Sequence, residues 1–115
     1  MSASNAAKVL GGPPTGPGKA HKVSGIPTCE YTRGSKAVTI EFMGVVARTV
    51  FDTEGKAAPK PVAHLNGIGS DAYSVDGGQD LMAWKNSIEL YFVTAGLKQP
   101  LPGLKAAAMA AIGRV

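Results

Sequence analysis

The clearest pattern in the chain is the alternation of hydrophobic and polar residues between Val62 and Val93. Ile88, Leu90 and Phe92 alternate with Glu89, Tyr91 and Val93, which is the two-residue period of a β-strand with one buried face. Residues typical of turns divide this stretch into four short strands, expected at 62–65, 72–75, 81–84 and 87–93. The pattern therefore predicts an antiparallel meander whose second face is half-exposed.

A second alternating segment lies in the first half of the chain, at residues 37–43. Val38, Ile40 and Phe42 point to one side of the predicted strand and their neighbours to the other. A preceding strand is expected within 23–31, and the turn residues between the two segments favour a β-hairpin.

Helical patterns mark both ends of the chain. Residues 4–10 begin with a capping serine and end at Gly11, and residues 102–113 repeat apolar side chains every three or four positions. Residues 44–54 fit a helix or a strand, and we expect a helix because residues 52–55 resemble a helix end. The fold class predicted is α+β, with an antiparallel sheet of four to six strands packed by N- and C-terminal helices.

Composition indicates a single domain. The chain has 115 residues, of which 44% are hydrophobic and 17% charged, enough to bury one core. We expect one α+β domain over residues 1–115. Glycine and proline gather at residues 11–22, predicted to be a loop, and at 55–61, predicted to be a linker.

The formal net charge is +4, and it is concentrated near the N-terminus. Five scattered basic residues precede residue 37, which favours a solubility role over an interaction tail. No basic run interleaved with aromatic residues supports nucleic-acid binding. No apolar stretch is long enough for a transmembrane segment, and the first residues lack the pattern of a signal peptide, which leaves a cytosolic protein or one with its leader removed.

Three residues could form a catalytic site if the fold brought them together. Cys29 as nucleophile, His64 as base and Asp71 as orienting group would make such a set. A cysteine on a strand is more often a small buried hydrophobe. Together with His21 these residues lack the close spacing of metal ligands, so no metal site and no cofactor are predicted.

The glycine-rich segment 67–71 superficially suggests a phosphate-binding loop. The dinucleotide-binding pattern requires a third glycine three positions later, followed by a helix. Ala72 occupies that position here and strand-forming residues follow it. A tight turn or a bulge in the sheet is the favoured interpretation.

Five aromatic residues on the predicted sheet faces are candidates for an apolar ligand pocket. They are equally compatible with ordinary core and cross-strand packing. The candidate ligand-binding residues are Tyr31, Phe42, Tyr73, Trp84 and Tyr91.

Four short motifs resemble those of a family of uncharacterised actinobacterial secreted lipoproteins. They are Val9-Leu10-Gly11, Cys29-Glu30-Tyr31, the segment from Gly67 to Tyr73 and the helix from Pro102. The chain departs from the family pattern in lacking a lipobox cysteine and a second cysteine. The resemblance implies an extracytoplasmic, secreted or periplasmic, non-enzymatic protein, and it transfers no catalytic residues.

We therefore expect an extracytoplasmic binding module for an apolar small molecule or a protein partner. The alternative is a small enzyme with its site in the concavity of the sheet, using His64, Asp71 or Cys29 as acid, base or nucleophile. A third possibility is a structural module that oligomerises through an open sheet edge.

Overall fold

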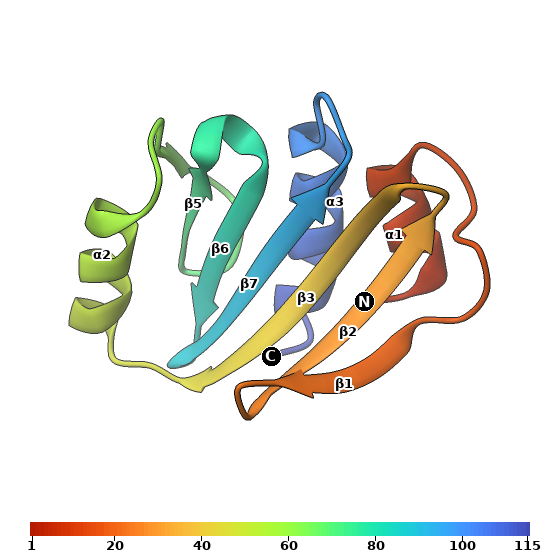
Figure 1. Cartoon of the computed structure of the whole chain (residues 1–115). Coiled ribbons are helices and arrows are strands. Elements are labelled where there is room, and N and C mark those ends of the chain that lie inside the picture. Colours follow the sequence, from red (N-terminus) through yellow and green to blue (C-terminus); the bar gives the residue numbers. More distant parts are fainter.

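A single seven-stranded antiparallel sheet and three helices form the protein in the computed structural model, which describes residues 1–115 (Figure 1). The strand order is β1-β2-β3-β7-β6-β5-β4. The strands are β1 (Lys19–Val23), β2 (Ile26–Arg33), β3 (Lys36–Val45), β4 (Ala63–Leu65), β5 (Asp71–Val75), β6 (Asp80–Lys85) and β7 (Ile88–Ala95). The helices are α1 (Ala3–Leu10), α2 (Arg48–Ala57) and α3 (Leu101–Ile112). The predicted α+β fold, with helices at both ends of the chain, is confirmed.

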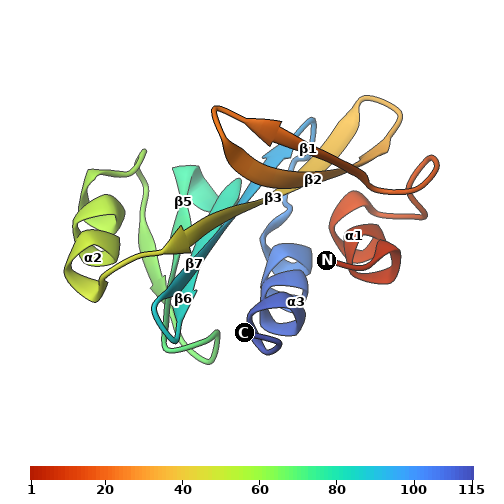
Figure 2. The same ribbon diagram turned by 90° about the horizontal axis from the view of Figure 1, so that it is seen from below.

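The helices lie on opposite faces of the sheet. Helices α1 and α3 pack side by side against one face, whereas α2 packs against the other face near β5 and β6 (Figure 2). The main core joins α1 and α3 to the inward side chains of the sheet, with Phe92 and Leu104 fully buried at its centre. A smaller cluster under α2 consists of Phe51, Val75 and Met82.

The terminal helices approach each other closely because Gly103 has no side chain. A Cβ atom built on Gly103 would overlap the carbonyl oxygen of Lys8 and come within 2.8 Å of the Cα atom of Val9. Both obstacles are backbone atoms of α1, which cannot move without shifting the helix. The small residue therefore sets the spacing of α1 and α3.

Replacing Gly103 with alanine is expected to lower the free energy of unfolding by about 1–3 kcal/mol, since the new methyl group must push the two helices apart. Chemical denaturation measures this change. Gly12→Ala is the matched control, because the atoms nearest to its Cβ belong to the end of the Arg33 side chain, which can shift without moving the backbone. An equal free energy of unfolding for Gly103→Ala and Gly12→Ala would show that Gly103 does not set the spacing of the two helices.

Three expected boundaries are corrected by the structure. The segment 11–22 is not all loop, because β1 occupies its last residues and supplies the strand beyond the four to six expected. Residues 44–54 are divided between the end of β3 and the start of α2. The linker expected at 55–61 begins inside α2, where Gly55 lets the helix lie against the ring of Tyr73.

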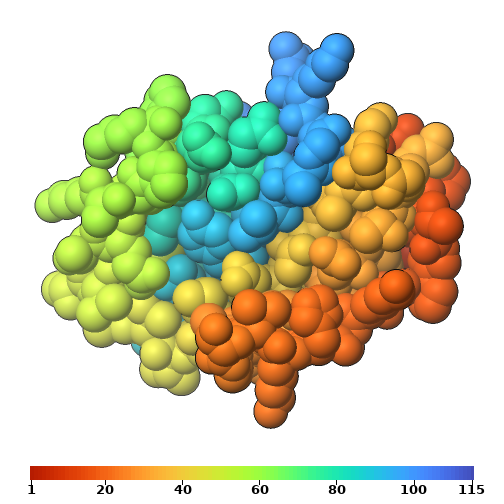
Figure 3. All heavy atoms as spheres, viewed as in Figure 1, coloured from red at the N-terminus to blue at the C-terminus, as the bar shows by residue number.

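The meander is confirmed, with small shifts in its turns. Asn86 and Ser87 form the connection between β6 and β7, both with positive φ, one residue later than expected. Two consecutive left-handed residues are the geometry of a tight hairpin turn. No helix covers the α2-side face of β1, β2 and β3, so these strands reach the surface there (Figure 3).

Candidate functional site

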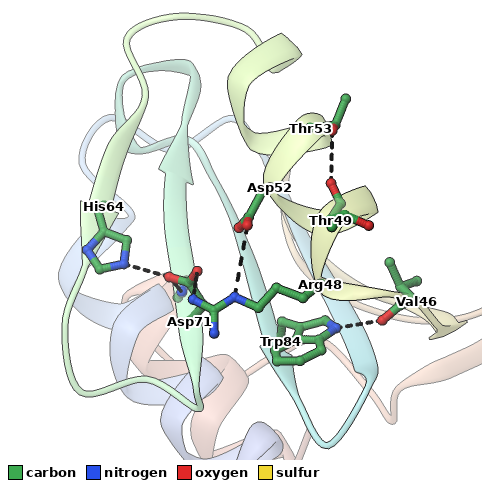
Figure 4. A network of polar contacts seen from close by, with 9 residues as sticks. Val46, Arg48, Thr49, Asp52, Thr53, His64, Asp71 and Trp84 are labelled. Atoms are coloured by element: carbon green, nitrogen blue, oxygen red, sulfur yellow. Dashed lines mark hydrogen bonds and ion pairs between the residues drawn. The ribbon is translucent and has the colours of Figure 1, made fainter.

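A polar cluster lies where β4, β5 and the start of α2 meet (Figure 4). Asp71 is its centre and is only 5% exposed. One carboxylate oxygen, Oδ1, lies 2.5 Å from Nε2 of His64, and Oδ2 accepts a hydrogen bond of 3.1 Å from Nη2 of Arg48. Nε of Arg48 also lies 3.9 Å from a carboxylate oxygen of Asp52.

Strand pairing explains how His64 and Asp71 meet. His64 stands opposite Tyr73 in the β4–β5 ladder, so its side chain and that of Asp71 project from the same face of the sheet, as residues two apart do. The imidazole ring packs edge-on against the ring of Tyr73, with 5.3 Å between centroids. Arg48 is the first residue of α2, so its side chain reaches Asp71 from the helix and not from a strand.

Aromatic side chains hold α2 in this position. The indole nitrogen of Trp84 donates a 2.7 Å hydrogen bond to the carbonyl of Val46, and the guanidinium carbon of Arg48 lies 5.6 Å from the centre of the Trp84 ring. Phe51 packs between Tyr73 and Trp84 at centroid distances of 5.6 and 6.3 Å. The polar cluster therefore lies beside a layer of packed aromatic side chains.

The cluster has the donor and acceptor pattern of an oriented histidine. A carboxylate only accepts hydrogen bonds, so Nε2 of His64 is the donor in its contact with ionised Asp71. The side chains of His64 and Arg48 are 54% and 55% exposed, so both are open to solvent. The same geometry also satisfies the buried charge of Asp71, which receives a further bond from the amide of Ala72.

The structure brings together two of the three candidate catalytic residues. Cys29 projects from β2 toward the opposite face of the sheet, where α1 and α3 pack. His64 therefore cannot activate the thiol of Cys29 as a nucleophile. Arg48 was missed by the sequence reasoning, because its position beside Asp71 depends on how α2 packs on the sheet, which no local pattern indicates.

An apolar pocket of about 190 Å³ opens on the face that carries α1 and α3. No charged side chain lines it, and the hydroxyl of Thr28 already donates to the carbonyl of His21 at 3.0 Å. Phe42 on its wall is 44% exposed. The lining residues are Pro27, Thr28, Cys29, Ile40, Phe42 and Leu90.

The five candidate aromatic residues do not share one cavity. Phe42 lines the apolar pocket, whereas Tyr31 is buried nearer α1 and donates from its hydroxyl to the carbonyl of Met1 at 2.9 Å. Tyr73, Trp84 and Tyr91 pack around the small cluster beneath α2, on the other face. Of the five, Phe42 alone lines a pocket.

A buried acid lies under α2. Glu89 is fully buried, and neither of its carboxylate oxygens has a hydrogen-bond partner. Burial, together with the adjacent carboxyl group of Glu54, raises the pKa of Glu89 to about 8. The alternating pattern assigned Glu89 to a half-exposed face, but α2 and the neighbouring strands enclose it.

No group of three His, Cys, Asp or Glu side chains is placed to hold a metal ion. None of the three helices has the length and apolar character needed to cross a membrane. Comparisons of the chain with protein-family models, with curated proteins and with solved structures find no match.

Proposed function

We propose that the protein is an extracytoplasmic, non-enzymatic binding module that takes an apolar group into the pocket beside Phe42. The observation that carries the proposal is a hollow without charged lining residues next to a large aromatic side chain that is 44% exposed. Binding an apolar group to this surface is favourable, because it removes apolar surface from contact with water. The extracytoplasmic location is what the resemblance to secreted lipoproteins implies.

The size of the pocket limits what it can hold. Its volume is about 190 Å³, and an engineered apolar cavity of roughly 150 Å³ in another protein binds benzene. The pocket therefore matches one aromatic ring or one short branched alkyl group. That group could belong to a small molecule or to a side chain of a protein partner.

Cys29 offers a direct measurement of occupancy, since its thiol lines the pocket and is the only one in the chain. Indole is expected to slow the reaction of Cys29 with a thiol reagent in a saturable manner. Phe42→Ala is expected to weaken the protection roughly tenfold, because it removes the exposed aromatic wall.

Val50→Ala is the matched control, since Val50 is 51% exposed but lies on α2, on the other face of the sheet. Protection that is absent, or equally affected by both variants, would contradict the proposal. Native mass spectrometry of the protein purified from its own host then distinguishes the two sources of the apolar group. A small mass lost on denaturation identifies a small molecule, and a second polypeptide identifies a protein partner.

A second candidate function is acid–base catalysis at His64, favoured by its 2.5 Å contact with Asp71. The contact would orient the ring and leave Nδ1 as the base. Two observations weigh against this function: Arg48 already pairs with the same carboxylate, and neither pocket of the protein is lined by His64 or Asp71.

Hydrolysis of 4-nitrophenyl acetate tests the second candidate. If His64 is a general base, His64→Gln should lower the rate by roughly a hundredfold or more. His21→Gln is the control, because His21 is an exposed histidine on β1, a strand without any buried residue. An equal and small loss in both variants would show ordinary surface imidazole reactivity and remove this candidate.

A further inference from the structure

We propose that a second hollow, at the C-terminal end of α3, binds a small organic anion through Lys85 and the loop 66–70. The hollow has a volume of about 310 Å³. The second hollow shares no residue with the apolar pocket beside Phe42, so the two sites are separate. The residues around the second one are Gly67, Gly69, Ser70, Lys85, Met109, Ile112 and Gly113.

Hydrogen-bond donors around the hollow lack partners in the protein. The ammonium group of Lys85 takes part in no salt bridge, and the hydroxyl of Ser70 makes no hydrogen bond within the chain. The amides of Gly67 and Gly69 also have no backbone acceptor, whereas that of Ser70 donates to the carbonyl of Trp84 at 2.9 Å. Unpaired donors gathered around one space favour a ligand that accepts hydrogen bonds.

The loop is held in a fixed shape. Ile68 is 2% exposed and belongs to the main core, so it anchors the loop against α3. Gly67 and Gly69 on either side have φ angles of +80° and +59°, and alternating backbone handedness forms concave arrays of amides that bind anions. A Cβ on Gly69 would lie 2.8 Å from the carbonyl oxygen of Trp84, so only glycine fits there.

The charges around the hollow favour an anion. Lys85 is the only charged lining residue. Asp71 follows Ser70 directly, but its carboxylate points to the other face of the sheet, toward His64 and Arg48. Lys85 attracts an anionic ligand and repels a cationic one.

The C-terminal end of a helix normally disfavours anions through its exposed carbonyl groups. In α3 most of these groups are already occupied. The carbonyls of Met109, Ala111 and Ile112 accept hydrogen bonds from the amides of the three residues that follow the helix. Carbonyl oxygens that already accept hydrogen bonds oppose an anion less strongly than free ones do.

An apolar wall completes the hollow and selects an organic ligand. The hollow is lined by Met109, which is 54% exposed, and by the buried side chain of Ile112. A volume of about 310 Å³ lies at the lower end of known ligand pockets, roughly 300–1,000 Å³. The ligand class that fits is a carboxylate or phosphate head group carrying a short hydrocarbon chain.

Titration of the full chain with hexanoate, followed by amide NMR signals, tests the proposal. Hexanoate and hexyl phosphate are expected to shift the signals of Gly67, Gly69, Ser70 and Gly113 to saturation. Their relative affinities identify the preferred head group. Lys85→Gln should raise the dissociation constant about tenfold, because a charge-assisted hydrogen bond is lost, whereas Lys105→Gln on α3, which does not line the hollow, should leave it unchanged.

Two further measurements separate the charged and apolar contributions. Met109→Gln should weaken binding of hexanoate and leave that of inorganic phosphate unaffected. Saturable binding of hexylamine equal to that of hexanoate would overturn the proposed charge selectivity. Hexanoate binding that is absent, or unchanged by Lys85→Gln, would overturn the site, and phosphate binding as tightly as hexyl phosphate would overturn the role of the apolar wall.

Discussion

Replacement of Phe92 by alanine is expected to lower the free energy of unfolding by roughly 3–5 kcal/mol, a large share of the ~5–15 kcal/mol that stabilises an ordinary domain. Phe92 is fully buried in the main core, opposite Ile40 in the β3–β7 ladder and Leu81 in the β6–β7 ladder. Removing its ring loses apolar burial and leaves a cavity between the sheet and the terminal helices. Urea denaturation measures the change.

Phe42→Ala provides the comparison for this prediction. Phe42 lies on the same face of the sheet, but it is 44% exposed and borders the apolar pocket. Its truncation therefore removes much less buried area and should cost well under half as much. A loss of stability as large as that of Phe92→Ala would show that Phe42 belongs to the core, and it would remove the argument for an open pocket.

The stability of the protein should decrease as the pH rises from about 4.5 to 8, and Glu89→Gln should abolish much of that decrease. In the folded protein, burial first and Glu54 second raise the pKa of Glu89 from 4.5 to about 8. The unfolded chain releases this proton near pH 4.5, whereas the folded chain keeps it until about pH 8. The loss over this range is on the order of a few kcal/mol.

The sign of the effect distinguishes Glu89 from most carboxylates. Below pH 4.5 both states hold the proton and wild type and Glu89→Gln should have similar stability. Near pH 8 the variant should be the more stable of the two, because an amide needs no ionisation. Denaturation curves at pH 5, 6.5 and 8 measure the free energy of unfolding of both proteins. A difference between the two proteins that is the same at all three pH values would contradict this prediction.

Glu54→Gln is the control for the neighbouring charge. Removing the carboxyl group of Glu54 eliminates the second cause of the raised pKa of Glu89 and leaves burial in place. The pH range over which the stability of the protein decreases should therefore become narrower, but it should not disappear. A variant identical to wild type would show that burial alone determines the titration of Glu89.

The regular parts of the fold could be predicted because burial leaves a periodic pattern in the sequence. Strand β7 alternates Ile88, Leu90 and Phe92 with their neighbours, and α3 repeats apolar residues at helical spacing. Strand β1 was missed because all five of its residues are exposed at the sheet edge, so no side chain reports its conformation. Gly55 was interpreted as a helix end although it lies inside α2, where it permits contact with Tyr73.

The candidate site could be predicted only in part, because its partners are distant in the sequence. His64 and Asp71 were named as possible partners and are adjacent on neighbouring strands. Arg48 comes from a helix whose packing no local pattern indicates, and the same helix encloses Glu89. The placement of α2 on the second face of the sheet therefore determined most of what sequence reasoning missed.

The pairing of β3 with β7 has a consequence for how the protein folds. All other neighbouring strands in the sheet are consecutive in the chain, so β1 to β3 and β4 to β7 are two local meanders joined along this single ladder. Closing the intervening loop of roughly forty residues carries an entropic cost that the local hairpins avoid. We expect the pairing of β3 with β7 to be the step that limits the folding rate. Substitutions along the β3–β7 ladder should then slow folding more than equally destabilising substitutions in the β4–β5 hairpin.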